Sequence, residues 1–413
     1  MSVIILLSMF LVSVLNINAQ VTDSAHELYD IGKKFSDEGL YDKALPYFKA
    51  AVEEDPDYKQ AFFELAKTSI TCRDFTQGFT LMHEYFINED PLDKQWHGES
   101  LEGKRLLIKV PHLPLDDIML FIRFLDYLKD ECASIILAIN CYSASFFAIN
   151  PMLFVVISDD GSSYYYNYDA DCYYDNGSYD CYYTYNNTYY DNDCCYYNDG
   201  TNCYYDGTFS SLGYDYQVHL LSLPFLCNKQ AMMMHQCPYF YSEKSYKEYW
   251  QEKMTYNSNT AIGLYFNPDN TVITHEDCIS LINKVCALGN TNVYYLQSAP
   301  YYMQPLLPGI HNNVVMDFLP TDGTSLKNFA AIIDNLDLVI TDNDSIAELA
   351  GGLGKEVFVV APYNADWRYY QQNSNSLWYS NMTLFKPQYY ENWQLFFDAI
   401  IDQTEKFCSS GEC

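Results

Sequence analysis

The stretch that decides the fold is residues 328–362, which read NFAAIIDNLDLVITDNDSIAELAGGLGKEVFVVAP. The apolar run 338–340 has the composition of a short strand buried in a parallel sheet. The small residues that follow predict a helix, and the glycines within 351–354 end it. A second apolar run, 357–361, predicts the next strand. This order of helix, strand, helix and strand indicates an α/β domain.

The start of the helix between these two strands is a candidate binding site. A helix N-terminus at the C-terminal edge of a parallel sheet presents free amide groups and a partial positive charge, which favour an anion. Ser345 and Glu348 also have the spacing of a capping box, in which two side chains bond the free amides of the first turn. A plain capping box would explain both residues without any ligand.

The same run resembles the C-terminal domain of bacterial TPR-linked glycosyltransferases, which are relatives of the heptosyltransferases. In that family the strand ends in Thr-x-Asp-Thr-x-x-x-His-Leu-Ala-Gly-x-Leu-Gly-Lys. The resemblance continues through residues 362–363, 366–368, 377–379 and 384–386, and it covers most of 103–400 except one insertion. It implies the GT-B fold, with two Rossmann-like domains, and a scaffold for nucleotide-sugar transfer.

The first strand of the presumed catalytic region is predicted at 104–110, followed by a helix from about 118 to 130 and a strand at 133–139. Adjacent carboxylates, Asp116 and Asp117, stand in the turn between strand and helix. The resemblance assigns Asp117 the role of the general base that deprotonates the acceptor hydroxyl. Two adjacent carboxylates repel, so one of them is expected to have a raised pKa. Alternatively, one of them caps the helix.

The resemblance also locates the site for the nucleotide-sugar donor, and this sequence departs from it. Asn343, Asp344 and Glu348 stand where the family has Asp, Thr and His, and Ser345 lies in the same turn. Carboxylates at these positions repel a diphosphate and compete with it for the helix dipole. A divalent metal bridging Asp342 and Asp344 would restore binding. Because the family binds its donor without metal, we expect no metal and no cofactor other than the donor.

Asp366, Trp367 and Arg368, together with the aromatic pair 378–379, match the wall of the cleft in the family. Their rings could stack on the base or the sugar of the donor. Alternatively, they form a packed corner between the two domains.

The N-terminus reads as a secretory signal peptide over residues 1–19, because an apolar run too short to span a bilayer ends at a small residue. Residues 22–92 follow as two TPR-like helical repeats of 34 residues. In the first repeat, the small residues Gly32 and Ala44 would let two helices approach closely. Two repeats are too few for a free solenoid, so we expect them to pack onto the next domain.

The remaining chain divides into an N-terminal Rossmann-like domain, 103–240, and a C-terminal one, 255–405. The first contains an insertion at about 160–213 that repeats Cys-Tyr-Tyr and Tyr-Asp units. Its Asn-Gly and Asp-Gly pairs favour hairpins, but its scarcity of aliphatic residues is equally typical of a low-complexity loop. We predict that deleting 163–207 leaves thermal stability nearly unchanged and abolishes any self-association.

Composition limits the partners of the protein. The 413 residues carry a formal net charge of −31, which disfavours nucleic acid and anionic membranes. No later segment has the ~20 apolar residues of a membrane span. Fourteen cysteines fit an oxidising compartment and disulfide formation. These features predict a protein that is secreted or lies in the cell envelope or secretory lumen, with a protein partner on the repeats or the insertion.

The sequence therefore predicts an α/β protein of two Rossmann-like domains, preceded by a short helical repeat segment. Its predicted function is transfer of a sugar from a nucleotide-sugar donor to a glycan or protein hydroxyl. The alternative is a non-catalytic interaction or assembly protein, a pseudoenzyme that keeps the GT-B scaffold and has lost the donor site. The carboxylates around the predicted donor site favour the alternative, and the resemblance favours the transferase.

Overall fold

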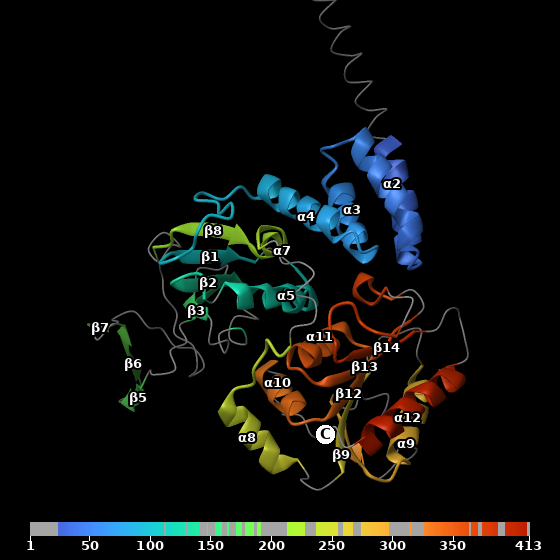
Figure 1. Ribbon diagram of the computed structural model, residues 1–413. Coiled ribbons are helices and arrows are strands. Elements are labelled where there is room, and N and C mark those ends of the chain that lie inside the picture. Colours follow the sequence, from blue (N-terminus) through green and yellow to red (C-terminus); the bar gives the residue numbers. More distant parts are fainter. Residues whose placement is uncertain are drawn as a thin grey trace, which may run out of the picture.

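The computed structural model contains a helical N-terminal part and two parallel sheets (Figure 1). It describes most of the chain from residue 24 to residue 410. The described residues are 24–110, 113–128, 130–139, 147, 153–158, 163–164, 171–175, 178–185, 188–190, 213–227, 237–254, 259–266, 274–296, 314–315, 326–362, 365–370, 374–386 and 393–410. The predicted signal peptide lies outside these ranges.

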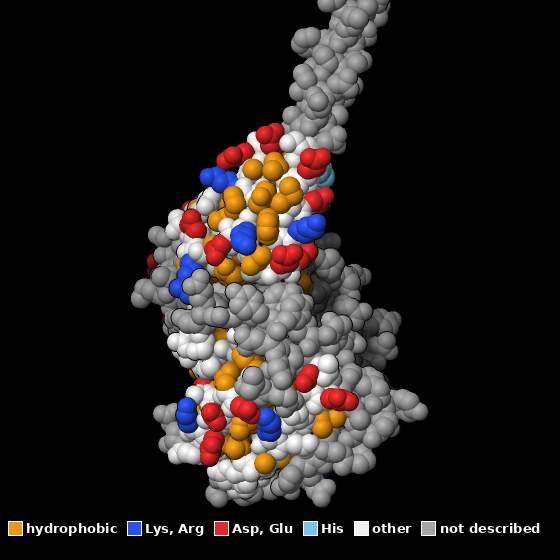
Figure 2. All heavy atoms as spheres, turned by 90° about the vertical axis from the view of Figure 1, so that its right-hand side faces the viewer, with side chains coloured by type: hydrophobic (Ala, Val, Ile, Leu, Met, Phe, Trp, Pro, Cys, Tyr) orange, Lys and Arg blue, Asp and Glu red, His pale blue; other side chains and the backbone are white. Residues whose placement is uncertain are grey.

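The N-terminal part is a run of consecutive helices. A first helix at 24–37 is followed by α2 (Tyr41–Glu54), α3 (Lys59–Thr71) and α4 (Phe75–Glu89), and neighbouring helices pack on one another. Gly32 is needed for this packing, because a Cβ there would lie 2.9 Å from the Phe48 ring. Figure 2 shows apolar side chains framed by charged ones on the outer face of these helices. The helices also pack onto the rest of the molecule, since α4 contacts the segments that follow strand β8.

The first sheet has the order β4-β3-β2-β1-β8, and its strands are parallel except for β4. Its strands are β1 (Arg105–Lys109), β2 (Ser134–Ile139), β3 (Leu153–Ser158), β4 (Ser163–Tyr164) and β8 (Tyr216–His219). The short segments η3 (Leu220–Ser222) and α7 (Leu223–Leu226) follow β8. The apolar side chains of β1 and β2 are buried, as their sequence predicts.

The helix predicted from about 118 to 130 is present, but it begins and ends about three residues earlier and its second half is not α-helical. The chain forms α5 (Leu115–Phe121) and then a tighter 3₁₀ segment, η1 (Ile122–Tyr127). At the junction of the two segments, the Nε of Arg123 donates to the carbonyl of Leu120 at 2.8 Å.

Within the predicted insertion the chain forms three antiparallel strands in the order β5-β6-β7. They are β5 (Asp171–Asp175), β6 (Ser178–Tyr185) and β7 (Thr188–Tyr190). Residues 191–212 lie outside the described ranges. The predicted effect of the deletion on stability and assembly therefore stays a prediction.

The second sheet is parallel throughout, in the order β11-β10-β9-β12-β13-β14. Its strands are β9 (Thr260–Tyr265), β10 (Thr291–Tyr295), β11 (Val314–Val315), β12 (Leu338–Thr341), β13 (Glu356–Val360) and β14 (Met382–Phe385). The helical elements are α8 (Lys244–Lys253), α9 (His275–Cys286), α10 (Leu326–Asp334), α11 (Asp344–Gly352), η5 (Trp367–Tyr369) and α12 (Trp393–Ser410). The strand order reverses between β9 and β12, where ligands bind in open parallel sheets.

The two sheets meet where α5 packs on α11. A strap at 237–240 holds this contact, because the amides of Tyr239 and Phe240 donate to the Gly352 carbonyl at 2.9 and 3.0 Å. A Cβ at Gly352 would lie 2.3 Å from the Phe240 ring, so the strap requires glycine there. Gly354 then ends the helix with a φ of +79°.

In the described part of the chain, no helix has the length and apolarity needed to cross a membrane. The seven cysteines whose side chains are described are free thiols. The cysteines of the insertion fall outside that set, so their predicted bonding stays a prediction.

Candidate functional site

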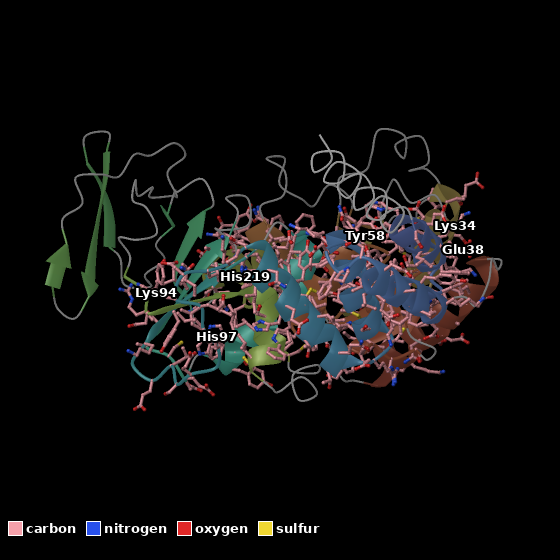
Figure 3. The ribbon with its side chains drawn as sticks, turned by 90° about the horizontal axis from the view of Figure 1, so that it is seen from above. Lys34, Glu38, Tyr58, Lys94, His97 and His219 are labelled. Carbon is pink, nitrogen blue, oxygen red and sulfur yellow. The ribbon has the colours of Figure 1, made fainter. Side chains whose placement is uncertain are left out.

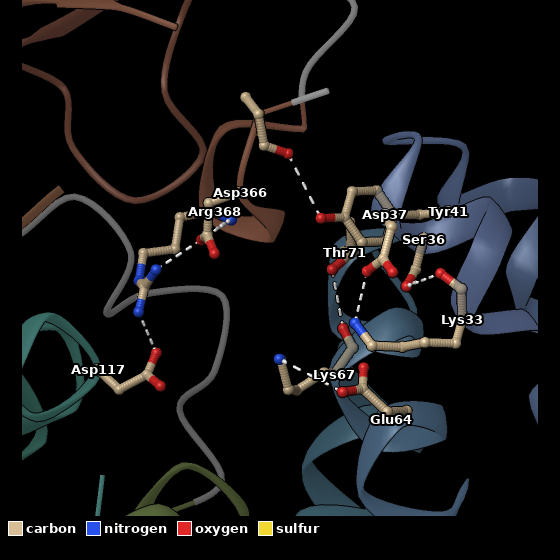
Figure 4. Close-up of polar contacts among 11 residues, drawn as sticks. Lys33, Ser36, Asp37, Tyr41, Glu64, Lys67, Thr71, Asp117, Asp366 and Arg368 are labelled. Atoms are coloured by element: carbon tan, nitrogen blue, oxygen red, sulfur yellow. Dashed lines mark hydrogen bonds and ion pairs between the residues drawn. The ribbon is translucent and has the colours of Figure 1, made fainter. Parts of the chain in front are cut away.

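The predicted base and the predicted cleft wall meet in one cluster of charges between the two sheets (Figure 4). The Arg368 guanidinium contacts Asp116 Oδ2 at 2.7 Å and Asp366 Oδ1 at 2.5 Å, and it also donates to Asp117. The Arg368 side chain is 2% exposed. We call these four residues the carboxylate–arginine cluster. It brings together side chains from α5 and η5, about 250 positions apart in the chain.

The carboxylates of α5 do not cap their helix. Pro114 occupies the N-cap without a side-chain hydrogen bond, and Asp116 and Asp117 lie in the first turn. The capping alternative is therefore wrong, because the neighbouring Arg368 pairs with these carboxylates. Burial raises the pKa of Asp117, Arg368 opposes this, and Asp116 adds to it. The pKa of Asp117 thus lies above its usual range, and the main cause is burial, with the predicted repulsion by Asp116 a smaller contribution.

The predicted site for the donor lies at the start of α11. Asn343 is the N-cap, and its side chain accepts from the amide of Ile346 at 3.1 Å. The predicted capping box of Ser345 and Glu348 is wrong, because the helix begins at Asp344 and Asn343 already bonds the free amide. Burial, followed by the charge of Asp366, raises the pKa of Asp344 to about 7. The helix start is thus occupied by polar groups of the chain itself.

Glu348 points into the core instead of towards the helix start. Its side chain is fully buried, Tyr379 donates to its Oε2, and Tyr369 donates to its Oε1 at 3.5 Å. Burial raises the pKa of Glu348 to about 7, although Arg368 and the Tyr379 hydrogen bond oppose the rise. A ligand does not reach this carboxyl in the observed structure.

The aromatic residues of the predicted cleft wall are buried. Trp367 is 6% exposed, and Trp378 and Tyr379 are each 1% exposed. The rings of Trp367 and Trp378 meet edge to face at 5.7 Å. The stacking wall predicted for a base or sugar is therefore wrong, and the alternative, a packed corner between domains, is what the structure contains.

The sequence reasoning missed Arg123, which joins the two sheets beneath this corner. Its Nη1 donates to the Trp378 carbonyl at 2.6 Å, and its Nη2 donates to the Tyr239 hydroxyl at 3.2 Å. The Tyr239 and Tyr379 hydroxyls are 2.6 Å apart and continue the network to Glu348. The signal was present: a lone arginine in an apolar helical stretch must be paired if it is buried.

The electrostatics of the site are unfavourable for a diphosphate. In the cluster one guanidinium faces three carboxylates, and Asp344 interacts with the same Asp366 and Arg368 charges. An added phosphate at ~4 Å from an uncompensated carboxylate meets a repulsion of ~4 kcal/mol at an effective dielectric constant of ~20. Among the side chains that the structure describes, no group of three or more His, Cys, Asp or Glu could hold a metal ion.

Comparisons with known proteins address the fold. No protein-family model matches the sequence, and no curated protein matches it. Among solved structures, a glycosyl transferase family 9 protein from Veillonella parvula is similar at 10% identity and a TM-score of 0.50, covering 76% of this chain and all of the other. E. coli ADP-heptose lps heptosyltransferase II aligns at 9% identity, a TM-score of 0.44 and 75% of this chain, again with all of the other covered. The first likeness shows that this chain shares the fold of a glycosyltransferase of family 9.

Proposed function

We propose that this chain is a non-catalytic interaction protein on a glycosyltransferase scaffold, and that its cleft no longer takes a nucleotide-sugar donor. The observation that carries the proposal is the carboxylate–arginine cluster. The charge of Arg368 acts on Asp344 at the start of α11, and three carboxylates already neutralise this guanidinium. A diphosphate needs a cation with spare hydrogen-bonding capacity, because phosphate recognition rests on charge-assisted hydrogen bonds.

The start of α11 supports the same conclusion. Asn343 bonds the amide that an anion would use, and Asp344 adds a carboxyl at the positive end of the helix dipole. Removing Arg368 from its partners would leave three partly buried carboxylates without a counter-charge, which is unfavourable. A rearrangement that frees Arg368 for a diphosphate would therefore not lower the free energy of the complex.

The experiment is titration calorimetry of the full chain with adenosine and uridine diphosphates and their glucose conjugates, with and without Mg²⁺, at pH 8. We expect no binding by the unaltered chain at millimolar ligand. Asp344→Thr removes a carboxylate from the helix start, and we expect it to raise the affinity for a nucleoside diphosphate at least ~tenfold. Glu276→Gln, an exposed charge change in the first turn of α9, is the matched control and should have no effect.

A transferase is the second candidate, and one observation favours it. Asp117 follows the C-terminal end of β1 and faces the start of α11 across the α5–α11 contact, where the resemblance assigns a general base. Tight donor binding by the unaltered chain, with sugar transfer that Asp117→Asn abolishes, would establish this candidate and overturn the proposal. The Asp117→Asn protein must keep its fold in that comparison, which circular dichroism checks.

We further propose that the protein acts outside the cytosol. The support is the predicted signal peptide and the cysteine content. Nucleotide sugars are scarce outside the cytosol and secretory lumen, which agrees with a non-catalytic role for a secreted chain. N-terminal sequencing of secreted material should begin near Gln20, and material that still begins at Met1 would contradict this location.

A further inference from the structure

A polar pocket of about 260 Å³ lies between the N-terminal helices and the start of η5 (Figure 4). It is separate from the α5–α11 contact, although Asp366 belongs to both its lining and the cluster. Its lining comes from the first helix, α2, α3 and the 366–367 segment, and its charged members are Lys33, Asp37, Glu64, Lys67 and Asp366. The pocket therefore exists because the helical part packs against the second sheet's domain.

The charged groups of this pocket form two ion pairs within the N-terminal helices, and both pairs are at least partly exposed to solvent. Lys33 Nζ contacts Asp37 Oδ1 at 2.6 Å, and these side chains are 43% and 61% exposed. Lys67 Nζ lies 3.9 Å from Glu64 Oε1, which is too long for a hydrogen bond. An ammonium group has three donors, so Lys67 retains hydrogen-bonding capacity. The exposed Lys33–Asp37 pair can be replaced by contacts to a ligand at little cost, since exposed ion pairs contribute ~0–1 kcal/mol.

The composition of the lining selects the class of ligand. Lys33 and Lys67 balance Asp37 and Glu64, and the third carboxylate, Asp366, is paired with Arg368, so neither a strong anion nor a strong cation is favoured. Hydroxyl, ammonium and carboxylate groups supply both donors and acceptors, while the apolar contribution is small. At about 260 Å³ the pocket is slightly below the ~300 Å³ at which sites for drug-sized ligands begin. A small neutral ligand with many hydroxyl groups satisfies all three conditions.

We infer that this pocket binds a neutral saccharide, with one sugar ring inside it. Vicinal hydroxyls of a sugar both donate and accept, and a Lys–Asp pair such as Lys33 and Asp37 offers the complementary groups side by side. The inference names a ligand for the proposed interaction protein and does not depend on whether the cleft binds a nucleotide.

Neighbouring residues of the first helix provide matched controls. Lys34 and Glu38 are exposed and lie next to Lys33 and Asp37 in sequence, but they are not part of the pocket lining (Figure 3). Lys33→Met and Asp37→Asn remove hydrogen-bonding charge from the pocket. Lys34→Met and Glu38→Gln make the same chemical changes beside it. All four changes affect side chains at least partly exposed to solvent, so the fold is retained.

The experiment is saturation-transfer NMR and calorimetry of the full chain against neutral hexoses, N-acetylhexosamines and their disaccharides. We expect at least one sugar to bind, with Lys33→Met and Asp37→Asn each weakening it ~tenfold and the matched controls changing it less than ~twofold. Absence of binding across the panel would overturn the inference, as would binding that the pocket variants leave unchanged. Binding of oligolysine but of no sugar would overturn it in favour of a cationic ligand.

This result is distinguishable from the test of the cleft. The same variants are titrated with the nucleoside diphosphates, to which we expect them to respond as the unaltered chain does. Loss of the saccharide inference would leave the diphosphate titrations standing. Tight diphosphate binding would likewise overturn the proposed function without touching the pocket.

Discussion

The carboxylate–arginine cluster and the saccharide pocket share one residue, Asp366, but the charged side chains are more buried in the cluster than in the pocket. In the cluster, Arg368 is 2% exposed and contacts three carboxylates. In the pocket, Lys33 is 43% exposed and its ion pair with Asp37 faces solvent. Burial, more than the kind of residue, decides whether a charged side chain holds the fold together or remains available to a ligand.

The comparison has an energetic form. Removing one partner of a buried ion pair leaves an uncompensated charge and costs ~3–5 kcal/mol, whereas an exposed pair contributes ~0–1 kcal/mol. Substitutions in the cluster should therefore change the free energy of unfolding, and substitutions in the pocket should change binding instead. The predictions below test this division, starting with the largest expected change.

Arg368→Met should have the largest effect. It removes the counter-charge of Asp116, Asp117 and Asp366, so we expect the free energy of unfolding to fall by ~3–5 kcal/mol at pH 7.5. Denaturant unfolding followed by circular dichroism measures the change. Lys244→Met is the control, because Lys244 is 88% exposed, and it should cost less than ~0.5 kcal/mol. A loss below ~1 kcal/mol for Arg368→Met would show that the cluster is not structural.

Glu348→Gln tests how the buried carboxyl of Glu348 makes the free energy of unfolding depend on pH. The pKa of Glu348 is about 7 in the folded protein against an ordinary 4.5, so the folded state binds this proton more tightly than the unfolded chain does. The protonated Glu348 therefore stabilises the folded state fully below pH ~4.5. This stabilisation is lost as the pH rises through 7, which lowers the free energy of unfolding by ~3 kcal/mol. Glutamine mimics the protonated acid and should remove that decrease.

The measurement for Glu348→Gln is the free energy of unfolding from pH 4.5 to pH 8, compared with the unaltered chain. The two proteins should agree at the low end, and the variant should be more stable by ~3 kcal/mol at pH 8. Glu252→Gln, on the exposed surface of α8, should differ by less than ~0.5 kcal/mol at either pH. Equal pH profiles for Glu348→Gln and the unaltered chain would contradict the enclosed geometry of this carboxyl.

Gly352→Ala tests the strap that covers the corner between the sheets. The new Cβ would lie 2.3 Å from the Phe240 ring, so we expect a loss of ~1–3 kcal/mol although alanine favours helix. Phe240→Ala vacates that space, and Gly352→Ala should cost less in that background. A double-mutant cycle of unfolding free energies measures the difference. Additive effects would mean that the two residues are not in contact.

The sequence predicts the framework of this molecule better than its site. The strands β12 and β13 lie within one residue of the apolar runs that predict them, since a buried parallel strand needs an unbroken apolar run. The resemblance assigns Asp117 the role of general base, which stays a prediction, and the structure places its carboxylate against Arg368. The local sequence pattern predicts these strands because residues close in sequence decide where a strand, a turn or a helix forms.

What local pattern misses is the pairing. Nothing near Asp117 in the sequence points to Arg368, because only the packing of α5 on η5's domain joins them. Glu348 looked like half of a capping box and is instead a buried partner of Tyr379, which stands 31 positions away. The roles of charged residues at this site thus depend on tertiary contacts that a periodicity cannot encode.

Lys33→Met is expected to give the smallest change in stability and carries the other half of the comparison. Its ion pair with Asp37 joins two exposed side chains one helical turn apart, so the free energy of unfolding should change by no more than ~0.5 kcal/mol. In contrast to Arg368→Met, the effect of Lys33→Met should appear in saccharide binding, measured on the same sample by calorimetry. The control Lys34→Met should change neither the stability nor the binding.

A large loss of stability with Lys33→Met would show that the pocket, like the cluster, is part of the folded core, and the division between structural and available charges would fail. A small loss of stability with a large loss of binding would sharpen that division, because a methionine of similar length keeps the apolar stem and removes the ammonium group.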